Sequence, residues 1–148
     1  MGYETVIVGS DGSRTAELAV RNAAELAVDH EARLVIVTAY KPARRDPADQ
    51  AFVPEDVRWA ITDVNQAEDR VRHGLKIAAD VGLARALTHA AAGSAADVLL
   101  DAADQYGADV IVVGSKGLTK SSRAVLGSVA AAVAHHAPCD VLIVQTVD

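Results

Sequence analysis

Short aliphatic runs alternate with longer amphipathic segments along the whole chain, and this alternation restricts the fold more than any other feature. The aliphatic runs predict four strands, at residues 4–8, 33–39, 109–113 and 140–144. A fifth strand at residues 85–91 is inferred only from its place between two predicted helices, because alanine is a poor strand former. Buried strands that alternate with helices are typical of a parallel sheet covered on both faces.

The segments between these runs predict four helices, at about residues 14–29, 57–81, 94–106 and 128–137. Ser13 is the expected N-cap of the first helix, and Ser94 with Asp97 is expected to cap the third. Three prolines and mixed charges predict a surface loop from Lys41 to Asp56. The 148 residues therefore form one predicted domain, residues 1–148, with the element order βαβαβαβαβ.

Two strand orders are compatible with that succession of elements. In the order 2-1-3-4-5 the ligand crevice of the sheet lies between strands 1 and 3, and in the order 3-2-1-4-5 it lies between strands 1 and 4. Polar turns follow strands 1 and 4, whereas strand 3 ends in plain alanines. We therefore expect an α/β fold with a five-stranded parallel sheet in the order 3-2-1-4-5, helices on both faces, and a crevice between strands 1 and 4.

A glycine-rich stretch follows the fourth strand, with the spacing Gly114-x2-Gly117-x9-Gly127-Ser128. Glycine lets a backbone approach a phosphate closely and exposes its N–H groups. A helix that begins just after Gly127 adds free N–H donors and the positive end of the helix dipole. In the expected strand order, Asp11 in the turn after strand 1 lies beside this stretch. The two turns together predict a site that holds the phosphates of a nucleotide.

Composition and charge narrow the partners that this chain can have. The net charge of −6 argues against a nucleic-acid partner or an anionic membrane surface. No apolar run is long enough to cross a membrane, and the N-terminus lacks the basic segment of a signal peptide. The single cysteine, Cys139, excludes an intramolecular disulfide and fits a reducing compartment, so we expect a cytoplasmic protein.

Other classes of site lack residues that they require. A phosphoacceptor receiver needs an acidic cluster after strand 1, an aspartate after strand 3 and a lysine after strand 5, but the chain has Asp11 alone, alanines and Gln145-Thr146. The glycine patterns of a dinucleotide-binding dehydrogenase and of a Walker A loop are both missing. His135, His136 and Cys139 lack a fourth ligand, and adjacent histidines point to different sides of a helix, which argues against a metal site.

The glycine spacing after the fourth strand, GSDGS after the first and the five alternating units together resemble the universal stress protein family along essentially the whole chain. The resemblance implies an adenine nucleotide alpha hydrolase-like fold. Because ATP-binding members of that family have this glycine pattern, it also implies an ATP-dependent regulatory module of the stress response, not an enzyme. The residues implied at the nucleotide are Gly9, Ser10, Asp11, Val37, Val113, Gly114, Ser115, Lys116, Gly117, Gly127, Ser128 and Val129.

The resemblance also suggests roles for individual residues. Asp11 would lie near the ribose or a phosphate-bound magnesium ion, and the backbone of Val37 would meet the adenine edge. Lys116 occupies a variable position of the motif, where its charge could contact a phosphate. ATP hydrolysis needs a positioned water and a base or an arginine finger, and because only Asp11 is available in the sequence we expect hydrolysis to be slow or absent.

The identity of the ligand stays open at this point. The glycine pattern does not separate ATP from cyclic AMP as the ligand, and a nucleotide-independent interaction module is the third possibility.

In the order 3-2-1-4-5 the fifth strand is an edge, and DVLIVQTV is long and apolar for an exposed edge. A homodimer through residues 140–146 is therefore expected, and the family resemblance implies the same antiparallel pairing of final strands.

Overall fold

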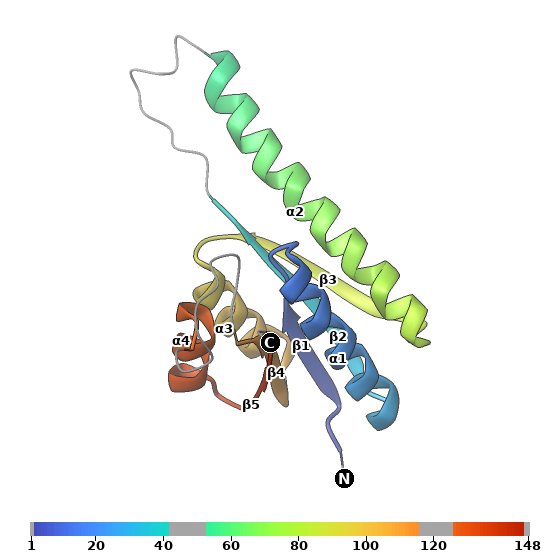
Figure 1. Ribbon diagram of the computed structural model, residues 1–148. Coiled ribbons are helices and arrows are strands. Elements are labelled where there is room, and N and C mark those ends of the chain that lie inside the picture. The colour runs from blue at the N-terminus through green and yellow to red at the C-terminus, as the bar shows by residue number, and fades with distance from the viewer. Residues whose placement is uncertain (1, 42–52, 116–125, 147–148) are drawn as a thin grey trace.

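The computed structural model describes residues 2–41, 53–115 and 126–146, and in the second range it describes side chains from residue 64 onward. The sheet has the order β3-β2-β1-β4-β5, and all neighbouring strands are parallel (Figure 1). Its strands are β1 (Thr5–Gly9), β2 (Arg33–Tyr40), β3 (Ala86–Ala92), β4 (Val110–Gly114) and β5 (Asp140–Val144). The predicted fold class and strand order are thus confirmed, and β1 and β4 lie side by side as expected.

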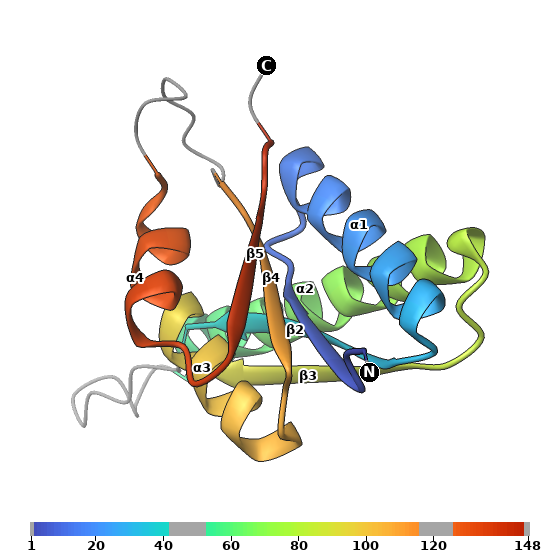
Figure 2. The same ribbon diagram turned by 90° about the horizontal axis from the view of Figure 1, so that it is seen from below.

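Helices cover both faces of this sheet (Figure 2). They are α1 (Arg14–His30), α2 (Val53–Val81), α3 (Ala95–Tyr106) and α4 (Ser128–His136). One apolar cluster joins α1 and α2 to one face of the sheet, and a second joins α3 and α4 to the other face. Alternation along each strand divides the side chains between the two clusters, so that Ile36 belongs to the first and Val35 and Val37 to the second.

The predicted helix ends agree with the structure where the sequence carries a cap. Ser13 caps α1 by accepting the Ala16 N–H, and Ser94 caps α3 by accepting the Asp97 N–H. Gly107 ends α3 with φ of 65°, a left-handed conformation that glycine adopts at little cost. Helix caps can be predicted from the sequence because each is a hydrogen bond between residues that are close together in the chain.

The predicted loop from Lys41 to Asp56 is wrong at its far end, because residues 53–56 already belong to α2. Pro54 is compatible with this earlier start, since N–H groups in a first helical turn have no helical acceptor to lose. Residues 42–52 of that prediction lie outside the described residues.

The two edges of the sheet differ in how they are covered. Each edge strand pairs with one described neighbour, β3 with β2 and β5 with β4. α2 packs against β3, whereas α1 and α4 contact β5 only sparsely. Leu142 and Ile143 of β5 are both substantially exposed. Among the described helices, none combines the length and the apolar composition that a membrane crossing requires.

Candidate functional site

A cavity of about 290 Å³ opens at the carboxyl ends of β1 and β4. The first turns of α1, α3 and α4 meet there, in the region where open α/β sheets bind ligands. The described residues that line it are Gly9, Ser10, Asp11, Ser13, Ala16, Val37, Ala39, Ala95, Leu99, Val113, Gly114, Gly127, Ser128, Val129 and Ala130. The cavity therefore joins the two turns that the sequence placed on either side of a crevice.

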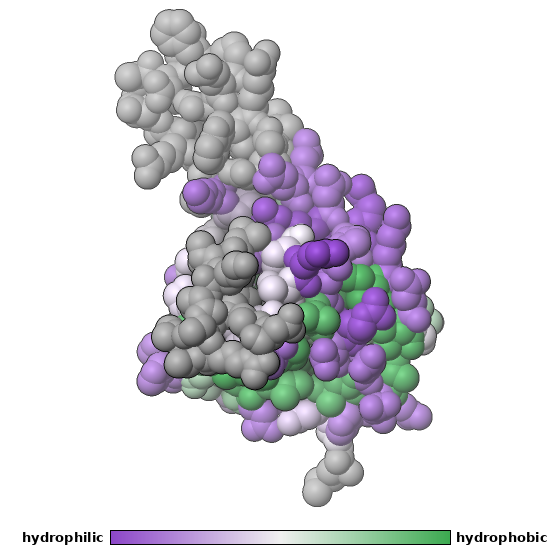
Figure 3. Space-filling model, viewed as in Figure 1, coloured by the Kyte–Doolittle hydropathy of each residue, from purple (hydrophilic) through white to green (hydrophobic). Residues whose placement is uncertain are grey.

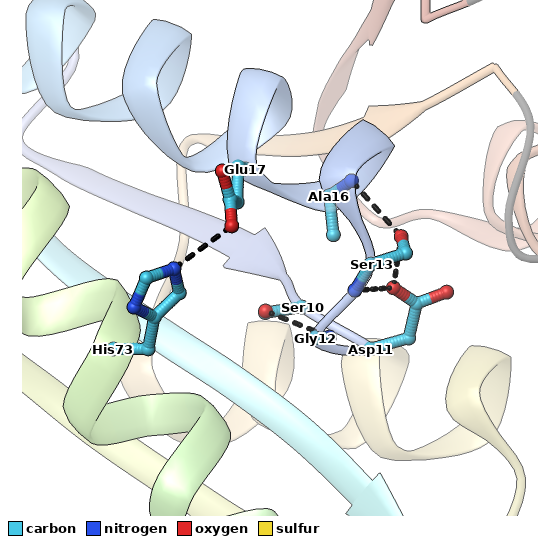
Figure 4. Close-up of polar contacts among 7 residues, drawn as sticks. All are labelled: Ser10, Asp11, Gly12, Ser13, Ala16, Glu17 and His73. Carbon is cyan, nitrogen blue, oxygen red and sulfur yellow. Dashed lines mark hydrogen bonds and ion pairs between the residues drawn. The ribbon is translucent and has the colours of Figure 1, made fainter.

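The turn after β1 is held by its own side chains (Figure 4). Oδ1 of Asp11 accepts hydrogen bonds from the backbone N–H of Ser13, at 2.9 Å, and from its hydroxyl. The Gly12 N–H lies 3.4 Å from the Ser10 hydroxyl, and Gly12 has φ of 81°. This Asx-type turn presents Ser10, Asp11 and Ser13 to the cavity.

The apolar wall of the cavity comes from β2 and α3. Val37 and Ala39 lie two residues apart on one face of β2, and Leu99 of α3 lies beside them in the lining. The carbonyl oxygen of Val37 accepts the Ser10 N–H at 2.8 Å, which ties the start of the β1–α1 turn to β2. One lone pair of that carbonyl remains for a ligand.

The far side of the cavity is the N-terminus of α4. Gly127 is its N-cap, in extended conformation, and no side chain among the described residues caps this helix. By contrast α1 and α3, whose first turns also border the cavity, carry the serine caps Ser13 and Ser94. Ser128 and Val129 thus bring uncapped helical N–H groups to the cavity, a typical arrangement for an anion.

Ser115 has a different place from the one that the sequence suggested. It is buried and does not line the cavity. Its hydroxyl lies 2.8 Å from Oε1 of Gln145 and accepts the Thr146 N–H at 3.1 Å, and its carbonyl accepts the Gly127 N–H at 2.7 Å. Ser115 therefore fixes the position of Gly127 relative to β4 and β5.

Most of the predicted site residues are brought together. Nine of them line the cavity, namely Gly9, Ser10, Asp11, Val37, Val113, Gly114, Gly127, Ser128 and Val129. Lys116 and Gly117 lie outside the described residues. The lining also includes Ser13, Ala16, Ala39, Ala95, Leu99 and Ala130, which the sequence reasoning did not assign to the site. Ala39 could have been predicted from the sequence as a site residue, because it follows Val37 at the two-residue spacing of one strand face.

The chemistry of the described lining is that of a binding site. Asp11 is its single ionisable side chain, and backbone N–H groups, hydroxyls and aliphatic surface make up the rest. No histidine, cysteine or glutamate from the described residues lines it, and the described lining contains no pair of groups for acid–base catalysis. No cluster of three or more metal-ligating side chains occurs among the described residues either.

The groups with altered acidity lie at the opposite end of the sheet. The Tyr3 hydroxyl donates to Oδ2 of Asp140 at 3.0 Å, and this bond to a carboxylate raises the pKa of Tyr3. Burial raises the pKa of the Cys139 thiol, with a further contribution from the negative charge of Asp140. Both residues flank the amino ends of strands, so their titration is separate from the cavity.

The family model described as "Universal stress protein family" matches residues 2–145 of this chain. A relative, Universal stress protein Rv1636 from Mycobacterium tuberculosis (strain ATCC 25618 / H37Rv), is 35% identical over 144 residues, which cover 97% of each chain. The similarity therefore includes both turns of the cavity and the whole sheet.

Solved structures with ligands are also similar to this chain. A universal stress protein in complex with cAMP has a TM-score of 0.75 and 33% identity, and the alignment covers 99% of this chain and 100% of that one. The universal stress protein from Archaeoglobus fulgidus in complex with dAMP has a TM-score of 0.69 and 25% identity, covering 98% and 100%. These similarities confirm the adenine nucleotide alpha hydrolase-like fold.

Proposed function

This chain belongs to the universal stress protein family, and we propose that it acts there as an adenine-nucleotide-binding regulatory module. The observation that carries the proposal is the cavity between the β1–α1 turn and the uncapped N-terminus of α4. It combines an apolar wall for a base with backbone donors for phosphates, which are the two halves of a nucleotide. The complexes of similar proteins with cAMP and dAMP support the same ligand class.

The lining suggests how the nucleotide is oriented. The base lies against Val37, Ala39 and Leu99, where the surface is aliphatic and the Val37 carbonyl has a lone pair to accept from an exocyclic amine. The ribose and phosphates lie toward Gly127 and Ser128, because a glycine at the N-cap lets a ligand approach the backbone N–H groups at the start of α4.

Asp11 is the residue that distinguishes the possible ligands. A carboxylate in the lining repels a triphosphate unless a divalent cation lies between them, and carboxylate oxygens with phosphate oxygens are the ligands that Mg²⁺ prefers. The first candidate is therefore ATP with Mg²⁺ held beside Asp11. Cyclic AMP is the second candidate, favoured by the similar protein that was solved in complex with cAMP.

The proposed role is regulation by occupancy and not turnover. Rapid ATP hydrolysis requires a positioned water and a base or a cationic group at the developing charge, and the described lining offers Asp11 alone. We place the module in the cytoplasm, where adenine nucleotides are abundant and the lone Cys139 stays reduced.

We also propose that the chain forms a homodimer through residues 140–146. β5 is an edge strand, and its Leu142 and Ile143 are large apolar side chains left exposed. In Figure 3 apolar residues gather in the lower part of the view, whereas polar residues cover the coloured part of α2. Pairing of two β5 strands would satisfy the free edge and cover Leu142 and Ile143 together.

Calorimetric titration of nucleotide-stripped protein tests the ligand. ATP with Mg²⁺ and cyclic AMP are the two titrants, and the Gly127→Val variant is titrated alongside the parent protein. Binding of ATP that exceeds binding of cyclic AMP and is lost in the variant supports the ATP-dependent module. A preference for cyclic AMP moves the function to second-messenger binding or buffering. Binding of neither nucleotide refutes the proposal and leaves a nucleotide-independent interaction module.

A further inference from the structure

The side chain of Arg70 lies outside the cavity and packs against the β1–α1 turn that lines it. Gly12 has φ of 81° and is not part of the lining, although its neighbours Asp11 and Ser13 are. A Cβ placed on Gly12 would lie 3.0 Å from Cγ of Arg70, 3.4 Å from its Cδ and 3.2 Å from its Nε. The stem of Arg70, which comes from α2, therefore covers the outer side of the β1–α1 turn.

A second contact joins the same two parts of the fold. His73 lies three residues after Arg70 and thus on the same side of α2. Its Nε2 is 2.9 Å from Oε1 of Glu17 in the first turn of α1 (Figure 4). α2 therefore meets the β1–α1 turn and the start of α1 at two successive positions along one face.

Arg70 meets the turn by packing of Cγ, Cδ and Nε, without an ion pair among the described residues. No carboxylate among the described residues forms an ion pair with Arg70, and its guanidinium makes no hydrogen bond within that part of the chain. Long cationic side chains commonly use their methylene groups in this way. Because α2 covers the opposite face of the sheet from α3 and α4, the effect of Arg70 on the cavity passes through the turn.

We propose that Arg70 is a positioning residue for the cavity, which holds the β1–α1 turn in the conformation that presents Asp11. Without the stem, the outer side of Gly12 is unsupported, and the bonds from Ser13 to Oδ1 of Asp11 form for a smaller fraction of the time. The statement about the turn is independent of the ligand, whereas its effect on affinity depends on the proposed nucleotide-binding function.

Amide hydrogen exchange of Ser13 in the ligand-free protein tests the turn directly. Arg70→Ala is expected to speed exchange of this N–H by roughly tenfold, on the scale of one lost hydrogen bond. Arg70→Met keeps most of the stem and is expected to exchange at the parent rate. The matched control is Arg72→Ala on the same helix, where Arg72 is 68% exposed and pairs with Asp69 at 3.3 Å. Alanine is a good helix former, so all three variants are expected to fold.

Nucleotide titration gives the second readout. Arg70→Ala is expected to weaken Mg-ATP and cyclic AMP alike, again by roughly tenfold, and to have no further effect in an Asp11→Ala background because it acts through Asp11. Unchanged Ser13 exchange in Arg70→Ala overturns the proposal. The proposal is also overturned if Arg70→Ala and Arg70→Met both weaken ATP binding and leave cyclic AMP binding unchanged. That result would mean that the charge of Arg70 contacts the triphosphate directly. If the parent protein binds neither nucleotide, the exchange measurement decides the proposal by itself.

Discussion

The hydroxyl of Ser115 lies within hydrogen-bonding distance of Oε1 of Gln145, at 2.8 Å, and this bond fastens the end of β4 to the residue after β5. The same hydroxyl accepts the Thr146 N–H, and the Ser115 carbonyl accepts the N–H of Gly127. Ser115 thus connects two strands to the start of α4. A residue inside the glycine motif serves to place the glycines that border the cavity.

Replacing Ser115 with alanine should lower the free energy of unfolding by about 2 kcal/mol. Ser115 is only 5% exposed, and the loss of its hydroxyl removes the acceptor of the Thr146 N–H bond at a buried position. Urea denaturation followed by circular dichroism measures the change. Ser128→Ala, at an exposed position, is the control and should change stability by less than about 0.5 kcal/mol.

Two substitutions of Asp11 should separate its two roles. Asp11→Asn keeps an oxygen that can accept from Ser13 and should leave stability nearly unchanged, whereas Asp11→Ala should lower the free energy of unfolding by about 1 kcal/mol. If Asp11 holds Mg²⁺, both variants should lose the Mg²⁺ dependence of ATP affinity. Titrations with and without Mg²⁺ measure this, and an unchanged dependence in Asp11→Ala, which has no side-chain oxygen, would exclude Asp11 as a metal ligand.

Gly127→Val should weaken Mg-ATP binding by about a hundredfold or more while the protein stays folded. The φ of Gly127 is −62°, which any residue adopts, so the backbone tolerates the change and the added side chain enters the cavity lining. Loss of two charge-assisted hydrogen bonds accounts for an effect of that order. Ala134→Val, on an exposed position of α4, is the control and should bind as the parent protein does.

A charge on β5 should dissociate the proposed dimer. Leu142→Lys places an ammonium group in the centre of the expected interface and should shift sedimentation at micromolar concentration to the monomer. Leu87→Lys is a matched control on the other edge strand, because Leu87 is 43% exposed and Leu142 is 41% exposed. If Leu87→Lys dissociates the protein and Leu142→Lys does not, the interface involves β3 instead.

Thr38→Val should raise the free energy of unfolding by about 1 kcal/mol. Thr38 is 2% exposed, and its hydroxyl has no hydrogen-bond partner among the described residues, so valine keeps the shape and removes a buried polar group without a partner. Alternation along β2 places Thr38 on the face opposite to Val37 and Ala39, and nucleotide affinity should therefore stay the same. Thermal unfolding checks the sign, and a destabilised variant would mean that the hydroxyl is bonded in solution.

Local sequence signals predicted most of the secondary structure. The caps Ser13 and Ser94 and the stop at Gly107 were all identified correctly, because each depends on a bond within a few residues. The start of α2 at Val53 was missed, since a proline-rich segment is typical of a loop and the tolerance of a first helical turn for Pro54 leaves no separate signal.

The sequence alone determined that β1 and β4 would be neighbours and that their turns would face one crevice, because polar turns in parallel strands converge on the same sheet edge. Only the tertiary structure decided which side chains reach the cavity. In the folded protein Ser115 bonds to the residue after β5, Ala95 and Leu99 of α3 line the cavity, and Arg70 packs against Gly12. These contacts join residues that are far apart along the chain, and no periodicity or cap within a single segment specifies them.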